Sequence, residues 1–199
     1  MGKILNGFTE NTAKNLQLDA GILVVGLETP ENFTGELSGA RKVGATSGGG
    51  NFTVETEIRN LFEDLDGARG NYKDGNVVDS CEVKLTVTIK EMTVENIKMA
   101  LGAADTQQKQ GTGQYDVTKA RMEIKASDYM DNVCWLGTIN GSDSPMIIEL
   151  KNVMNSNGLN FTFEDKGKGG IELELKAHFD LKKPDEAPFA IYTPGKKEE

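Results

Sequence analysis

The fold is decided by residues 52–90, which read FTVETEIRNLFEDLDGARGNYKDGNVVDSCEVKLTVTIK. At both ends of this stretch, apolar or small side chains alternate with polar ones, as they do in a strand that buries one face. The first alternating run places Phe52, Val54, Thr56 and Ile58 on one face, and the second places Cys81, Val83, Leu85, Val87 and Ile89 on one face. The sequence therefore predicts two sheet strands, each with one face in a core.

A long polar excursion, residues 61–75, joins these two strands. Most strand connections need only a few residues, so an excursion of this length is costly to order and indicates a function. It is not an EF-hand, because a register that starts at Asp64 puts Arg69 at the glycine position and Gly75 at the bidentate glutamate position. Only a weak, accidental cation site is left open.

A short helix is predicted directly after the second strand. Thr93 can cap its start with the side-chain hydroxyl, and Gly102 is placed to end it in the left-handed conformation. Val94, Ile97 and Leu101 form one apolar stripe. Because so short a helix is unstable alone, we expect it to pack on a sheet.

Several other segments show strand patterns, separated by turn residues. The predicted strands are residues 19–26, buried on both faces, and residues 40–46, 121–126, 133–138, 146–153, 159–163 and 171–181. A glycine run, residues 47–50, separates the second of these from the Phe52 strand, and residues 103–117 are predicted to be an exposed loop. This pattern favours a mostly β fold, an antiparallel β sandwich or barrel with one flanking α-helix.

The 199 residues are most simply one domain, residues 1–199. We expect a polar N-terminal arm, residues 1–18, and a C-terminal extension, residues 182–199, with one docking segment at 189–192. The two cysteines, Cys81 and Cys134, lie in strand patterns without metal-like spacing, which favours reduced core residues over a disulfide.

The net charge of −9, from 31 acids and 22 bases, would repel nucleic acid on average. No apolar run reaches the twenty or so residues that a spanning helix needs, and the N-terminus lacks a signal-peptide pattern. We therefore expect synthesis in the cytoplasm, without membrane association.

The sequence offers little chemistry for an enzyme. The single histidine, His178, lies on the polar face of the last predicted strand, where a solvated or interface role is commoner than catalysis. Residues 44–50, GATSGGG, lack the Lys-Ser/Thr end of a P-loop and precede a strand. Glu172 and Glu174 could suit a glycosidase pair, but alternating charges on an exposed strand are commoner. We predict a protein that is not an enzyme and has no catalytic residue, cofactor or metal.

Residues 39–101 resemble the major tail proteins of long-tailed bacteriophages, the subunits that build the tail tube. The resemblance is carried by the glycine-rich strand at 44–46, the alternating strand at 52–59, the DGARG loop at 66–70 and the strand-to-helix joint EMTVENI at 91–97. It implies a small β sandwich with one flanking helix. It also implies assembly into hexameric rings that stack as a hollow tube, through which the genome passes on DNA ejection.

In that family the long loop between two central strands bridges to the neighbouring ring. Carried onto this sequence, residues 61–75 become the candidate ring-stacking loop. Phe62 and Tyr72 are then candidate apolar anchors, and Asp66 and Arg69 are candidate polar ones.

The acidic balance fits a lumen along which DNA slides without specific binding. Glu172 and Glu174 are the lumen candidates, with plain outer-surface exposure as the other interpretation. The resemblance also implies the partners: other copies of the chain, and the tape-measure, tail-tip and tail-terminator proteins. It places the protein in the tail of the virion.

A monomeric β-sandwich binding module, for example for carbohydrate, is the alternative. One tryptophan, Trp135, and no clustered aromatic face count against it, because sugar platforms usually need stacked rings. A tail-tube subunit predicts self-assembly, whereas a binding module predicts a stable monomer with a concave aromatic site.

Overall fold

The computed structural model describes residues 7–37, 39–109 and 113–195. Antiparallel strands dominate it, and α1 is the one α-helix in these ranges, so the predicted fold class is confirmed. The elements are β1 (Gln17–Val25), β2 (Arg41–Lys42), β3 (Thr46–Asn60), β4 (Asn76–Ile89), α1 (Val94–Leu101), β5 (Ala104–Gln107), β6 (Val117–Ala120), β7 (Met130–Ile139), β8 (Met146–Asn155), β9 (Asn160–Thr162), β10 (Gly170–Lys176) and β11 (Phe189–Tyr192). Short 3-10 turns lie at Ala13–Asn15, Pro30–Asn32, Lys73–Gly75 and Ala126–Asp128.

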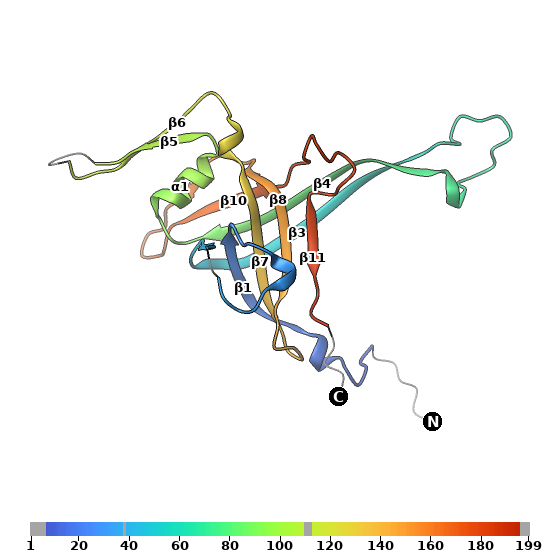
Figure 1. Cartoon of the computed structure of the whole chain (residues 1–199), viewed down its shortest axis with the longest axis horizontal. Helices are drawn as coiled ribbons and strands as arrows, with labels where there is room; N and C mark the ends of the chain where they lie inside the picture. The colour runs from blue at the N-terminus through green and yellow to red at the C-terminus, as the bar shows by residue number, and fades with distance from the viewer. Residues whose placement is uncertain (1–6, 38, 110–112, 196–199) are drawn as a thin grey trace.

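The larger strands belong to one sheet that folds over on itself. Its hydrogen-bonded order is β2-β1-β7-β8-β10-β4-β3, with β11 paired to β8 and β9 paired to β10. Strand β8 links the two halves, because most of it pairs with β7 while Met154 and Asn155 pair with β10. The halves form two layers whose strands cross in Figure 1. One layer is β2-β1-β7-β8-β11, and the other is β10-β4-β3.

The core lies between these layers and is built from alternating positions, as the sequence predicts for β4. Val83, Leu85, Val87 and Ile89 are all buried. They meet buried residues from β10 and from the other layer, including Ile171, Leu173, Leu175, Val133, Leu150 and Val153. Period-2 alternation in β4 and β10 therefore translates directly into one buried face in the body of the sandwich.

Helix α1 begins and ends where predicted, but it buries a different face. The Thr93 hydroxyl accepts a hydrogen bond from the backbone N–H of Asn96 (3.2 Å), and Gly102 ends the helix at a φ of 70°. The buried residues are Asn96, Met99 and Ala100, whereas the predicted stripe Val94, Ile97 and Leu101 is only half-buried.

A polar network explains this rotation of the helix. The buried Asn96 amide donates to the backbone oxygens of Val43 (2.7 Å) and Glu91 (3.0 Å), and its oxygen accepts from Arg41 (2.9 Å). These bonds fasten α1 to the corner where the chain passes from β2 toward β3. A sequence pattern based on apolar residues misses an anchor of this kind.

Two predicted strands near the N-terminus are corrected. Strand β1 is mostly exposed, with only Leu23 and Val24 buried, because Asp19 and Gly21 take positive φ angles and interrupt its pairing with β7. Of the strand predicted at 40–46, only Arg41 and Lys42 form a strand, β2. Of the predicted N-terminal arm, residues 7–16 are largely exposed, and residues 1–6 lie outside the described ranges.

The glycine run at 47–50 does not separate two strands but lies inside β3. Gly48 and Gly49 take φ angles of 78° and 74°, at a shift in register between Ser47 and Gly50. Glycine tolerates these angles without strain, so the run forms a β-bulge.

The segment after α1 is also corrected. Residues 103–117, predicted to be an exposed loop, contribute to the β5–β6 hairpin, which leaves the body on the side opposite the β3–β4 hairpin (Figure 1). The strand predicted at 121–126 does not form, and Met122 and Ile124 are exposed. Arg121 instead forms ion pairs with Asp105 and Asp128, which favours a turn here.

The last strand prediction is correct at its start and too long at its end. Strand β10 ends at Lys176, and Leu181 is 98% exposed. After Lys176 the chain leaves β10, and the backbone N–H of His178 donates to the backbone oxygen of Lys151 in β8 (3.1 Å). The docking segment at 189–192 is confirmed, since β11 pairs with β8 from Phe189 to Tyr192.

Candidate assembly surface

The β3–β4 hairpin extends well beyond the sandwich and ends in the loop at 61–75 (Figure 1). We call residues 57–80 the projecting ribbon. Its strands pair from Glu57 opposite Ser80 to Asn60 opposite Asn76. No strand of the other layer pairs with this part of the hairpin in the described chain.

One face of the projecting ribbon is apolar and uncovered. Residues directly opposite each other on antiparallel strands share a face, so Ile58 and Val78 lie together. Alternation along β3 places Ile58 on the same face as Phe52 and Val54, which stand opposite Leu85 and Val83 in the body. A shift in register between Glu57 and Ile58 brings Val78 of β4 to this face as well. Val83 and Leu85 are buried, but Ile58 is 59% and Val78 58% exposed. The core-facing side of the hairpin therefore continues past the end of the core.

The other face of the projecting ribbon is charged. Arg59 forms two hydrogen bonds with Asp79, Nε to Oδ2 at 2.8 Å and Nη2 to Oδ1 at 3.1 Å, and they hold the pKa of Asp79 below its usual range. The Ser80 hydroxyl donates to Glu57 (3.2 Å). The ribbon thus presents one charged face and one apolar face, and both faces are exposed to solvent.

The loop at the tip has its own small cluster, which includes both predicted aromatic anchors. The rings of Phe62 and Tyr72 meet edge to face, with centroids 5.6 Å apart, and Phe62 lies against Gly75. The Asn60 amide donates to Asn71 Oδ1 (2.6 Å) across the loop. Phe62 and Tyr72 therefore pack on each other and order the tip, and Tyr72 remains half exposed.

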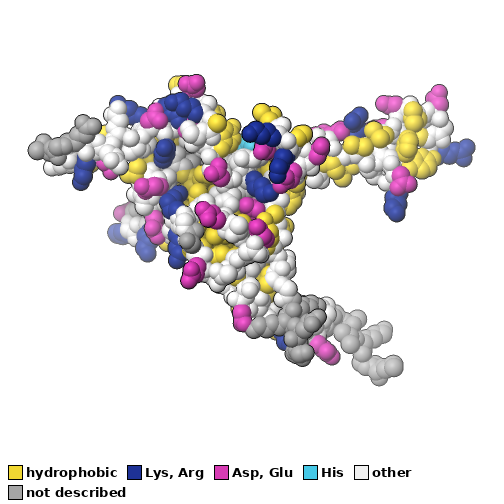
Figure 2. Space-filling model, viewed as in Figure 1, with side chains coloured by type: hydrophobic (Ala, Val, Ile, Leu, Met, Phe, Trp, Pro, Cys, Tyr) yellow, Lys and Arg dark blue, Asp and Glu magenta, His cyan; other side chains and the backbone are white. Residues whose placement is uncertain are grey.

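The predicted polar anchors, Asp66 and Arg69, are exposed at this tip. Ile58, predicted from the sequence to lie on a core face, is instead exposed, and hydrophobic side chains gather on the projecting part of the molecule (Figure 2). Three further apolar residues of this surface were not singled out from the sequence: Leu61, Leu65 and Val78, all at least half exposed. The pair Val77-Val78 just before the predicted second strand was the available signal, because it extends the apolar character of β4 outward.

The two lumen candidates lie on the outer face of the β10-β4-β3 layer. Glu172 accepts from the Asn160 amide (2.8 Å), and Glu174 accepts from the Ser156 hydroxyl (2.8 Å). Thr88 and Thr86 stand opposite them on β4. These partners are uncharged, but Lys84 and Lys176 lie further along the same face and both pair with Glu82, so the face carries charges of both signs.

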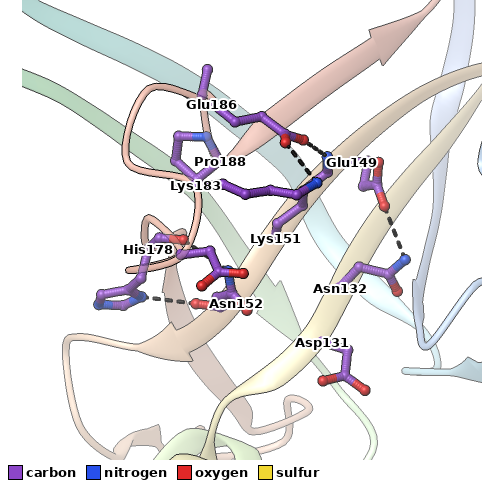
Figure 3. A pocket seen from close by; sticks show the side chains of 11 residues that line it. Asp131, Asn132, Glu149, Lys151, Asn152, His178, Lys183, Glu186 and Pro188 are labelled. Carbon is purple, nitrogen blue, oxygen red and sulfur yellow. Dashed lines mark hydrogen bonds and ion pairs between the residues drawn. The ribbon is translucent and has the colours of Figure 1, made fainter.

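His178 lies at an open cavity of about 260 Å³ near the C-terminal segment (Figure 3). Its Nδ1–H donates to the backbone oxygen of Asn152 (2.9 Å), and its ring meets Tyr129 edge to face. In the same cavity, Lys151 and Lys183 both pair with Glu186, at 2.8 and 3.0 Å, and lower the pKa of Glu186 to about 2. The side chains of Lys151, Lys183 and Glu186 are thus paired with one another.

A buried carboxylate next to this cavity holds β11 on the sandwich. Glu149 is 6% exposed and accepts from the hydroxyl of Tyr192 (2.9 Å) and the amide of Asn132 (3.1 Å). Burial and the nearby Glu149 raise the pKa of Tyr192 and raise that of Cys134 to about 12. Both Cys134 and Cys81 are free thiols, as predicted.

The sequence matches no protein-family model, and a search of curated proteins finds no matching relative. Within the described ranges, no set of three or more His, Cys, Asp or Glu side chains could hold a metal ion. No described helix has the length and apolar character needed to cross a membrane.

Proposed function

We propose that the chain is a structural subunit of a bacteriophage tail, which self-assembles into stacked hexameric rings that form the tail tube. The observation that carries the proposal is the uncovered apolar face of the projecting ribbon, with Ile58 and Val78 more than half exposed. The resemblance of residues 39–101 to tail-tube subunits supplies the kind of assembly.

An uncovered ribbon of this kind is unfavourable in water. A two-stranded hairpin is marginally stable in water, and exposed apolar side chains on a regular strand favour association. Strand β3 is also the terminal strand of its layer, so its outer edge carries backbone groups without a strand partner in the described chain. A ring can pair such edges between copies, and a repeated head-to-tail contact extends rings into a tube.

The outer face of the β10-β4-β3 layer is proposed as the lumen. Glu172 and Glu174 add two negative charges to this polar face, on which the lysines Lys84 and Lys176 are paired with Glu82. Such a face repels phosphates, so DNA would pass without specific binding. In this proposal the tape-measure, tail-tip and tail-terminator proteins remain the further partners.

The test is negative-stain electron microscopy with light scattering on the purified chain over a concentration series. Rings or tubes are expected for the natural sequence. The double variant Ile58→Ser with Val78→Ser should stay monomeric, because it makes the apolar face polar. Glu57→Ser, on the charged face of the same ribbon, is the matched control and should assemble. Equal assembly by the double variant would contradict the proposal.

A charge reversal at the tip tests the polar part of the loop. Arg69 is exposed, so Arg69→Glu should leave the thermal midpoint unchanged while it hinders ring stacking. Single rings without tubes in electron micrographs are the expected result. Tubes of normal length would show that Arg69 has no part in stacking.

One observation favours the alternative, a monomeric binding module. Trp135 and Phe52 line a cavity of about 290 Å³ between β1 and β3, with Gln17 and Asp19 beside them. An aromatic cavity with nearby polar groups suits a sugar ring. Tryptophan fluorescence titrated with a panel of oligosaccharides tests this function, and a Trp135→Ala variant that still binds would contradict it.

A further inference from the structure

A second exposed apolar cluster lies around β9. Leu159, Phe161 and Phe163 are all exposed, and Phe163 is 80% exposed. The rings of Phe161 and Phe163 have centroids 4.4 Å apart and are tilted by 58°. Phe161 also lies against Gly169, which leaves room for the ring because it has no side chain. We call Leu159, Phe161 and Phe163 the aromatic edge.

The aromatic edge and the ribbon tip lie at opposite ends of the same layer. Phe161 stands opposite Ile171, which stands opposite Ile89 at the end of β4. The last ribbon pair, Asn60 with Asn76, is at the other end of β4. With about 3.3 Å per strand residue, the two rows are separated by roughly 40 Å. Two unlike apolar surfaces thus lie at the two ends of one layer.

The charges beside these two surfaces are complementary. The loop at 61–75 contains four acids and two bases. The turn at 164–168 contains two acids and two lysines, and Lys90 adds a third ammonium there, because its Nζ donates to the backbone oxygen of Lys168 (3.0 Å). Contact between the acidic tip and this lysine-containing turn would lower the electrostatic energy of association.

We propose that the ribbon tip of one copy docks on the aromatic edge of a second copy, with Leu61 and Leu65 packed against Phe161 and Phe163. This inference rests on the proposed function and names the surface that receives the stacking loop. Because the two surfaces differ and face opposite ends of the layer, the contact is heterologous and repeats in one direction. A contact of this kind gives a polar stack of rings rather than a closed dimer.

The test uses two variants, each with one surface removed. The tip variant carries Leu61→Ser and Leu65→Ser, and the edge variant carries Phe161→Ser and Phe163→Ser. Neither should form tubes alone. Mixed in equal amounts they should associate, because each supplies the surface that the other lacks, and light scattering should show limited complexes in place of tubes. Leu181→Ser, at a 98% exposed position outside both surfaces, is the control and should assemble normally.

Each outcome decides a separate point. If the edge variant forms tubes like the natural sequence while the tip variant does not, the inference is wrong and the proposed function stands. If the natural sequence is monomeric at every concentration, both fail. The single variant Phe163→Ser separates a loss of docking from misfolding, because this side chain is too exposed to support the core. It should lower tube formation at least tenfold and leave the circular dichroism spectrum unchanged.

Discussion

The two halves of β4 have the same apolar face but opposite surroundings. In the body, Leu85 is 3% exposed and packs against the other layer, whereas Val78, on the same face of the same strand, is 58% exposed. Both positions carry an aliphatic side chain. The difference lies in the opposite layer, which ends before the ribbon begins. Strand pairing therefore determines which side chains share the apolar face, and the presence of a covering layer decides whether that face is core or contact surface.

The largest expected effect is in the body half. Leu85→Ala removes buried methyl and methylene groups and leaves a cavity between the layers, so it should lower the free energy of unfolding by about 2–5 kcal/mol. Urea denaturation followed by circular dichroism measures the loss. A change below about 1 kcal/mol would mean that the body half is as loosely covered as the ribbon.

A smaller effect is expected where β11 is fastened to the body. Tyr192→Phe leaves buried Glu149 with one hydrogen-bond donor fewer, which should cost about 1–3 kcal/mol. The pKa of Tyr192 is raised in the folded chain, so its contribution is complete below the ordinary tyrosine pKa and is lost as pH rises through the raised value. Thermal midpoints measured from pH 7 upward should fall more steeply above pH ~10 for the natural sequence than for the variant.

The smallest effect on stability is expected in the ribbon. Val78→Ser exposes no new core surface, so the free energy of unfolding of the monomer should change by less than about 0.5 kcal/mol. Assembly should nevertheless weaken, because the apolar face is interrupted. Sedimentation velocity and urea denaturation of one preparation measure both effects, and a loss comparable to that of Leu85→Ala would erase the distinction between the halves.

The sequence was most informative where local pattern and tertiary contact agree. Thr93 caps α1 and Gly102 ends it, because both act on the nearest turn of backbone. The alternation from Val83 to Ile89 gave the buried face of β4, and the docking segment at 189–192 is strand β11. The candidate stacking residues Phe62 and Tyr72 lie at the tip of the ribbon, where their rings contact each other, and this contact was not expected.

The sequence was least informative where a distant partner reverses a local pattern. Met122 and Ile124 alternate like strand residues, but Arg121 is held by Asp105 and Asp128, and the segment turns instead. Buried Asn96 sets the face of α1 through bonds to residues about fifty positions away in the chain. The aromatic edge was visible as an alternating run at 159–163, although its exposure was not.

The sequence by itself determined the class of the fold, because period-2 alternation, helix caps and turn glycines act through neighbouring residues. It also determined that a long polar loop separates β3 from β4. Only the tertiary structure decided how far the opposite layer reaches along these strands. Burial depends on residues that are remote in sequence, and for that reason the exposed positions of Ile58 and Val78 became evident only once both layers were in place.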